Sequence, residues 1–94
     1  MIKRIVKLTF KPELIDDFMV VFIESAPKIR SFVGCRHMEL LQNKAQKNIL
    51  FTLSEWDDES ALENYRNSEL FKTTWAKTKV LFDEKAEAWT VTNI

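Results

Sequence analysis

The sequence has little glycine, proline, cysteine or histidine: its 94 residues include one glycine, two prolines, one cysteine and one histidine. A chain so poor in glycine and proline, with 46% hydrophobic residues, is neither low-complexity nor disordered. A dinucleotide-binding loop needs several glycines, so that class of cofactor site is excluded. One cysteine rules out an intrachain disulfide, and Cys35 with His37 supplies too few ligands for a metal site. We therefore predict neither a cofactor nor a metal ion.

The sequence also lacks an excess of one charge and a long hydrophobic run. Lysine and arginine number 14, as do aspartate and glutamate, so no overall field favours nucleic acid or an anionic membrane surface. No stretch approaches the roughly 20 apolar residues of a membrane span. The first residues, MIKRIVKLTFKPE, carry charges at Lys3, Arg4 and Lys7 within their apolar run, unlike a signal peptide. We expect a cytoplasmic protein with no nucleic-acid or membrane partner.

Four segments alternate in side-chain character with the period of two that is typical of β-strands: residues 2–10, 35–42, 48–56 and 85–93. In the first segment, Arg4 is the exception on the face of Val6 and Leu8, and Ile5 lies between two lysines on the other face. The third segment likewise has one apolar face and one mixed face. Both faces of the predicted sheet should therefore be covered.

Helical spacing separates the first two of these strands. Pro12 suits the first position of a helix whose apolar stripe runs from Leu14 to Ala26. Pro27 should break or kink that helix, because proline lacks an N–H and its ring clashes with the preceding turn. Gly34 follows and is expected to adopt a backbone angle that other residues resist.

Two more helices are predicted before the last strand. Asp57 or Asp58 caps the first of them, and Ser68 followed by Glu69 begins the second. The second has one stripe at three-to-four spacing, formed by Phe71, Trp75, Thr78 and Phe82.

The order of elements is β-α-β-β-α-β, with the second helical region split in two. It predicts an α+β fold over one domain, residues 1–94: a ferredoxin-like sandwich with an antiparallel sheet and helices on one sheet face. The open face is expected to carry Ile5, Leu41, Leu50 and Trp56. Apolar area of that extent normally marks a partner surface, so we expect a homodimer that pairs through the open sheet face.

Several stretches resemble one known family: IVKLTFKPE at the start, FVGCRHMEL at the second strand, the run EW…YRNSELFKTTW, and EAWTV near the end. The sequence resembles the antibiotic biosynthesis monooxygenase (ABM) family, whose ferredoxin-like subunits pair into a dimeric α/β barrel. The resemblance implies a small aromatic ligand. Active members oxidise aromatic polyketides or quinols with O₂ and no cofactor. Other members degrade haem, act on signalling molecules or have no known activity, and fold alone does not choose among them.

Candidate catalytic residues are His37 and Thr52. His37 is the only side chain whose ordinary pKa suits proton transfer near neutrality, and Glu39 lies two residues on as a possible orienting or substrate-binding carboxylate. The alternative is that His37 is a polar residue satisfied at the dimer interface. The resemblance implies an asparagine four residues before Trp56 in quinone-forming members, where this chain has Thr52.

Trp56 and Tyr65 are the candidate substrate-binding aromatics. The ring of Trp56 can stack on a flat substrate or can simply plug the barrel end. In haem-degrading relatives, the resemblance implies a tryptophan at Tyr65 and the haem-ligating histidine at Trp75. Tryptophan cannot ligate iron, so haem degradation is disfavoured. Two hypotheses remain: a cofactor-independent monooxygenase, and a non-catalytic dimer of the same fold that binds a small apolar ligand.

Overall fold

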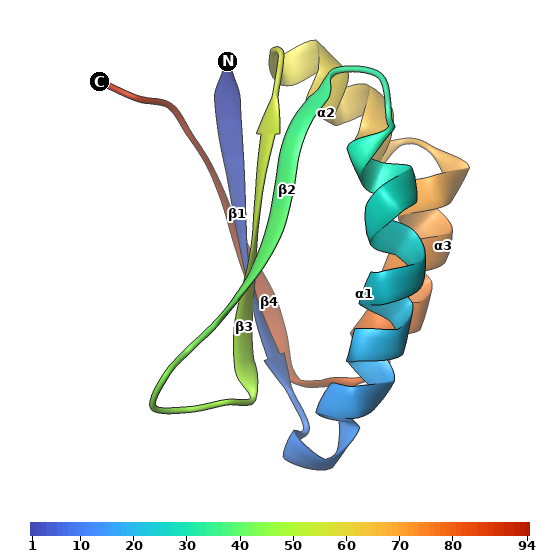
Figure 1. Cartoon of the computed structure of the whole chain (residues 1–94), viewed down its shortest axis with the longest axis vertical. Coiled ribbons are helices and arrows are strands. Elements are labelled where there is room, and N and C mark those ends of the chain that lie inside the picture. The colour runs from blue at the N-terminus through green and yellow to red at the C-terminus, as the bar shows by residue number, and fades with distance from the viewer.

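The computed structural model describes residues 1–94 as one sheet with helices packed on one of its faces (Figure 1). The four strands are β1 (Ile2–Phe10), β2 (Cys35–Gln42), β3 (Ile49–Trp56) and β4 (Phe82–Val91). The helices are the 3₁₀ turn η1 (Pro12–Leu14), α1 (Ile15–Arg30), α2 (Glu59–Arg66) and α3 (Glu69–Lys79). None of these helices has both the length and the apolar composition to cross a membrane.

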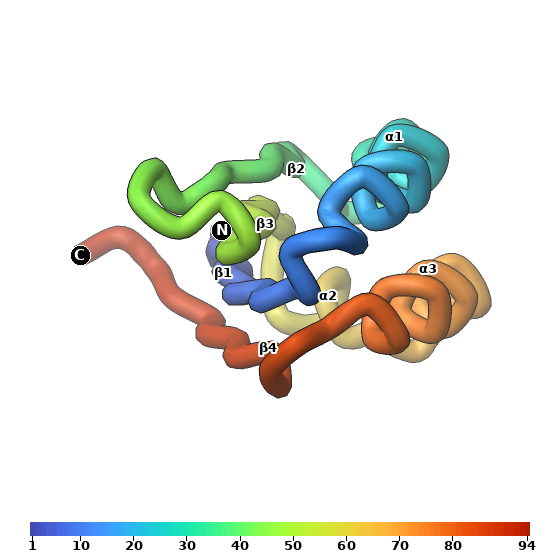
Figure 2. The backbone as a smooth tube through the Cα atoms, turned by 90° about the horizontal axis from the view of Figure 1, so that it is seen from below, coloured from blue at the N-terminus to red at the C-terminus, as the bar shows by residue number.

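The sheet has the strand order β2-β3-β1-β4, and all three neighbouring pairs are antiparallel. Seen along the sheet, α1 and α3 lie on the same side of it (Figure 2). This arrangement confirms the predicted α+β ferredoxin-like fold.

The pairing register decides which residues share a sheet face. Ile5 lies opposite Leu53 on one side and Trp89 on the other, on the face that no helix covers. Leu50 and Trp56 were also expected on that face, and this prediction was wrong. They point toward the helices and are only 2% and 0% exposed. Their residue numbers differ in parity from Leu53, so the pleat turns them to the opposite side.

The interior between sheet and helices contains two apolar clusters. One comprises Leu8, Phe10, Phe18 and Leu50; the other comprises Ile29, Met38, Trp56 and Leu62. The first cluster packs β1 and β3 against α1. The second cluster packs β2 and β3 against the end of α1 and against α2. The space between the two clusters contains the cavity described below.

The first helix begins as predicted but does not stop at Pro27. Pro12 opens η1, and α1 continues through Pro27 to Arg30, so Pro27 does not break the helix near Ala26. Ala26 and Ile29 are buried on either side of Pro27, and this packing holds the chain helical. The carbonyl of Ile23, four residues earlier, loses its usual backbone partner but lies on an exposed part of the helix where water can bond it.

The later helix starts are confirmed, whereas the last boundary is shifted. The Asp58 carboxylate accepts from the Ala61 N–H at 2.9 Å, and the Ser68 hydroxyl accepts from the Phe71 N–H at 3.1 Å. Phe82 was predicted inside the last helix but is the first residue of β4. There it lies opposite Phe10 in the sheet.

Candidate functional site

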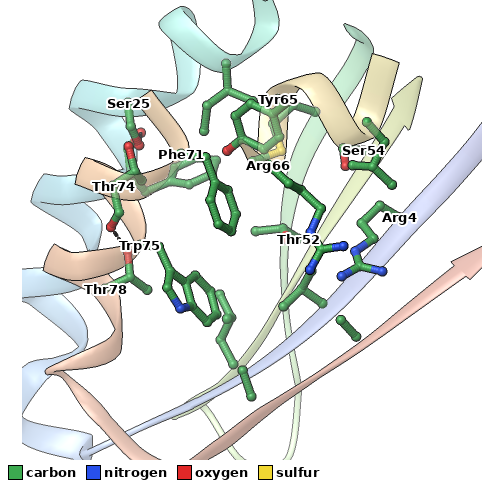
Figure 3. A pocket seen from close by; sticks show the side chains of 18 of the residues that line it. Arg4, Ser25, Thr52, Ser54, Tyr65, Arg66, Phe71, Thr74, Trp75 and Thr78 are labelled. Atoms are coloured by element: carbon green, nitrogen blue, oxygen red, sulfur yellow. Dashed lines mark hydrogen bonds between the residues drawn. The ribbon is translucent and has the colours of Figure 1, made fainter. Parts of the chain in front are cut away.

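A cavity of about 360 Å³ lies between the inner face of the sheet and the helices. All four strands contribute to its floor, and side chains from α1, α2 and α3 form its walls (Figure 3). Of the 20 residues that line it, 13 are hydrophobic. Its size and apolar walls are those of a pocket for a small organic molecule.

An aromatic series runs along one wall of this cavity. The ring of Tyr65 stacks on Trp56 with centroids 4.9 Å apart, and the edge-on contact from Tyr65 to Phe71 spans 5.3 Å. Phe71 in turn stacks on Trp75 at 5.9 Å. Trp56 is fully buried, and its indole Nε1 donates to the Ser54 hydroxyl at 2.9 Å. Trp56 therefore supports Tyr65 from behind, while Tyr65, Phe71 and Trp75 form the wall nearer the open space.

Few hydroxyl groups are free to bind a ligand in the cavity. Those of Ser25 and Thr78 donate to carbonyls of their own helices at 2.8 Å. Thr52 points into the cavity from β3 (Figure 3). Burial, and secondarily the nearby Cys35 thiolate, raise the pKa of the Tyr65 hydroxyl. Tyr65 consequently stays protonated at ordinary pH and can donate a hydrogen bond to a ligand oxygen.

Two arginines that sequence reasoning did not single out as site residues reach one end of the cavity. Arg4 comes from β1, and its Nη1 donates to the Thr90 hydroxyl at 2.9 Å. Arg66 comes from the last turn of α2, and its Nη1 lies 3.8 Å from the Glu63 carboxylate. Arg4 had a detectable signal, because it shares the parity of Val6 and Leu8 and so had to point inward.

A model of the family described as antibiotic biosynthesis monooxygenase matches residues 1–77 of the chain. The chain belongs to the ABM family. No curated protein matches it. The family assignment agrees with the resemblance seen in the sequence.

Solved structures agree with this ABM fold over nearly the whole chain. A conserved protein from Methanosarcina mazei Go1 is 25% identical, with a TM-score of 0.94 over 99% of this chain and 92% of its own. A structure described as an antibiotic biosynthesis monooxygenase is 21% identical, with a TM-score of 0.93 over 100% and 99%. A mutant of SnoaB, a cofactor-independent oxygenase from Streptomyces nogalater, is 17% identical, with a TM-score of 0.86 over 98% and 91%. Similarity at 21% and 17% identity shows the fold alone.

The ABM chain brings together three of the five predicted site residues. Thr52, Trp56 and Tyr65 all line the cavity. His37 and Glu39 lie on the opposite face of the sheet, where His37 Nε2 is 3.6 Å from a Glu39 carboxylate oxygen and each side chain is 45% exposed. Because β2 turns these two side chains away from the helices, they do not reach the cavity of their own chain. No three histidine, cysteine, aspartate or glutamate side chains are grouped so as to hold a metal ion.

Proposed function

We propose that this ABM-family chain is a cofactor-independent monooxygenase that oxidises a small, electron-rich aromatic, quinol-like or polyketide-like, with O₂. The observation that carries the proposal is the cavity itself, with its aromatic wall and the hydroxyl-bearing side chains of Thr52 and Tyr65 in its lining. The family assignment and the fold shared with a cofactor-independent oxygenase support the same reaction class.

In such a reaction the substrate supplies all of the electrons. For a methylene flanked by aromatic rings, the balanced change is R₂CH₂ + O₂ → R₂C=O + H₂O: one oxygen atom enters the product and the other leaves as water. The protein must bind the substrate, stabilise its anion and keep water away. In this chain Tyr65 and Thr52 would donate hydrogen bonds to a substrate oxygen, while Phe71 and Trp75 would flank the rings.

The proposal includes a homodimer built through the open sheet face. That face carries Leu41 and Trp89, each 45% exposed, together with the partly exposed side chains of Ile5 and Leu53. Covering these side chains with a second copy would remove a contiguous apolar patch from water. His37 would then lie at the interface rather than in the cavity of its own chain.

A non-catalytic ligand-binding protein of the same fold is the second candidate. One specific observation favours it: the residues that line the cavity include no histidine, aspartate or glutamate, the usual general bases. A ligand would be bound in the same position without a side chain to accept its proton.

Oxygen uptake with a panel of quinols and anthrones separates the two candidates. Wild-type protein is expected to accelerate uptake above the uncatalysed rate with at least one compound. If no compound reacts faster than in buffer while several raise the melting temperature, the monooxygenase proposal fails and the binding protein is supported.

The variant Tyr65→Phe keeps the aromatic wall but removes the hydrogen-bond donor, and we expect about a tenfold loss in kcat/KM.

A further inference from the structure

The cavity has an uneven distribution of charge in a chain that is neutral overall. Its lining contains two arginines and no carboxylate, whereas the whole sequence has 14 basic and 14 acidic residues. The only carboxylate close to either arginine is Glu63, 3.8 Å from Arg66 and largely exposed to solvent. Arg66 is 45% exposed, so the two cations lie at a partly open end of the apolar cavity, where their field attracts a negatively charged ligand.

The two guanidinium groups converge from different elements. Arg4 extends from β1 and Arg66 from the end of α2, and both approach the position of Thr52 (Figure 3). Burial and the positive charge of Arg66 lower the pKa of Arg4. The side chain of Arg4 makes one hydrogen bond, to the neutral hydroxyl of Thr90. Holding two like charges together costs free energy, which a bound anion would offset.

We propose that the ligand of this cavity carries an oxyanion, a carboxylate or an ionised phenol, held between Arg4 and Arg66 while its aromatic body lies along Tyr65 and Trp75. Guanidinium groups suit this task because their planar set of N–H donors matches the geometry of a carboxylate. The inference rests on the proposed function, which makes the cavity the substrate site. It narrows the substrate class to acidic aromatics.

Isothermal titration calorimetry with a matched pair of ligands tests this proposal. 2-Naphthoate carries the carboxylate, and 2-naphthamide has the same ring system without the charge. Wild-type protein is expected to bind the naphthoate at least tenfold more tightly than the amide. Arg66→Gln should weaken naphthoate binding about tenfold and leave amide binding unchanged.

Two further variants make this test specific. Arg4→Gln should act in the same direction as Arg66→Gln, with circular dichroism to verify that β1 remains folded. Arg36→Gln is the control, because it removes an equally positive side chain that is paired with Asp57 on the exposed surface outside the cavity. This control should bind both ligands as the wild type does.

A third ligand distinguishes the two kinds of oxyanion. At a pH where free 2-naphthol is neutral, a cavity that binds phenolates should induce the red-shifted naphtholate absorption band, and Arg66→Gln should abolish it. Tight naphthoate binding without this band would identify the oxyanion as a carboxylate.

If the naphtholate band does not appear, the proposal is overturned by equal wild-type affinity for acid and amide, by an affinity ratio unchanged in both cavity variants, or by no binding of either ligand at millimolar concentration. The oxygen-uptake result is independent. If the protein prefers the acid but shows no oxygen uptake, only the monooxygenase proposal is contradicted. If it takes up oxygen with neutral anthrones but does not prefer the acid, only the oxyanion site is contradicted.

Discussion

Tyr65 is the only tyrosine of the chain, so its ionisation can be followed without interference from another phenol. Burial raises its pKa above the ordinary value of about 10. We expect that the tyrosinate absorption band stays absent from the folded protein at about pH 11 and appears on unfolding. A folded protein that titrates with a midpoint near 10 would contradict the buried placement of Tyr65.

The same shift makes stability depend on pH in a defined direction. In the unfolded chain Tyr65 loses its proton near pH 10, whereas in the folded chain it keeps the proton. Above about pH 10, ionisation therefore lowers the free energy of the unfolded state but not that of the folded state. The contribution of Tyr65 to stability is therefore complete below about pH 10 and declines as the pH rises further. Denaturant titrations of wild type and Tyr65→Phe should diverge above pH 10. Parallel curves would show that the hydroxyl ionises equally in both states.

Gly34 has a backbone angle φ of +89°, which side-chain-bearing residues rarely adopt. A Cβ added there would lie 2.4 Å from the Cβ of Ala61 on α2. We expect Gly34→Ala to lower the free energy of unfolding by about 2–4 kcal/mol, from the backbone strain and the overpacking together. The double variant Gly34→Ala/Ala61→Gly relieves only the clash, so it should still be less stable than Ala61→Gly alone. Thermal melting of Gly34→Ala at the wild-type temperature would refute this account.

At the scale of elements, the cap of α3 holds the wall that carries Phe71 and Trp75. The Ser68 hydroxyl accepts from the Phe71 N–H and donates to the Tyr65 carbonyl at 2.5 Å, so it links α3 to the end of α2. Ser68→Ala should cost about 1 kcal/mol and lower the melting temperature by roughly 4–8 °C. Ser60→Ala, an exposed position within α2, is the matched control and should change stability little. An equal effect of both variants would mean that the cap is unimportant.

Elements could be predicted from the sequence more fully than their relative orientation. Alternation and capping are local signals, so β1, β2 and β3 and the helix starts at Asp58 and Ser68 were predicted nearly to the residue. The helical spacing of Phe71, Trp75 and Phe82 continued past Lys79, and only the pairing of Phe82 with Phe10 shows where β4 begins. Periodicity within one segment carries no information on that pairing.

The residues that form the site could likewise be predicted only in part from the sequence. Thr52 was singled out by family resemblance and Tyr65 by its helical spacing with Leu62, and the fold places both in the cavity. Leu50 was assigned to the wrong sheet face because both faces of β3 are partly apolar. Which residues of β1 and β3 share a face is known only once the pairing register of the two strands is known. The helical spacing of Arg66 indicates a side chain that is either solvated or paired with Glu63 or Glu69, and the pair with Glu63 is present. Nothing in a helical pattern reveals that β1 brings Arg4 to the same end of the cavity.

For the molecule as a whole, the open sheet face predicts a homodimer. Sedimentation equilibrium at micromolar concentration should give about twice the chain mass of 11.1 kDa. Trp89→Glu introduces a charge into the apolar patch and should shift the protein toward the monomer. Val33→Glu is the control, because Val33 is 86% exposed in the turn between α1 and β2, away from that face. A monomeric wild-type protein would contradict the proposed pairing of two copies through the open sheet face.

We propose that the cavity binds an aromatic substrate for oxidation by O₂ without a cofactor. The most direct test of this proposal is oxygen uptake with an anthrone by chelator-treated wild-type protein, compared with Ala86→Phe, which fills the cavity from β4 without changing a polar group. We expect uptake above the uncatalysed rate in the wild type, with one water and one ketone formed per O₂, and near-background uptake in the variant. Background uptake by the wild type, or equal uptake by a folded Ala86→Phe, would contradict the proposal.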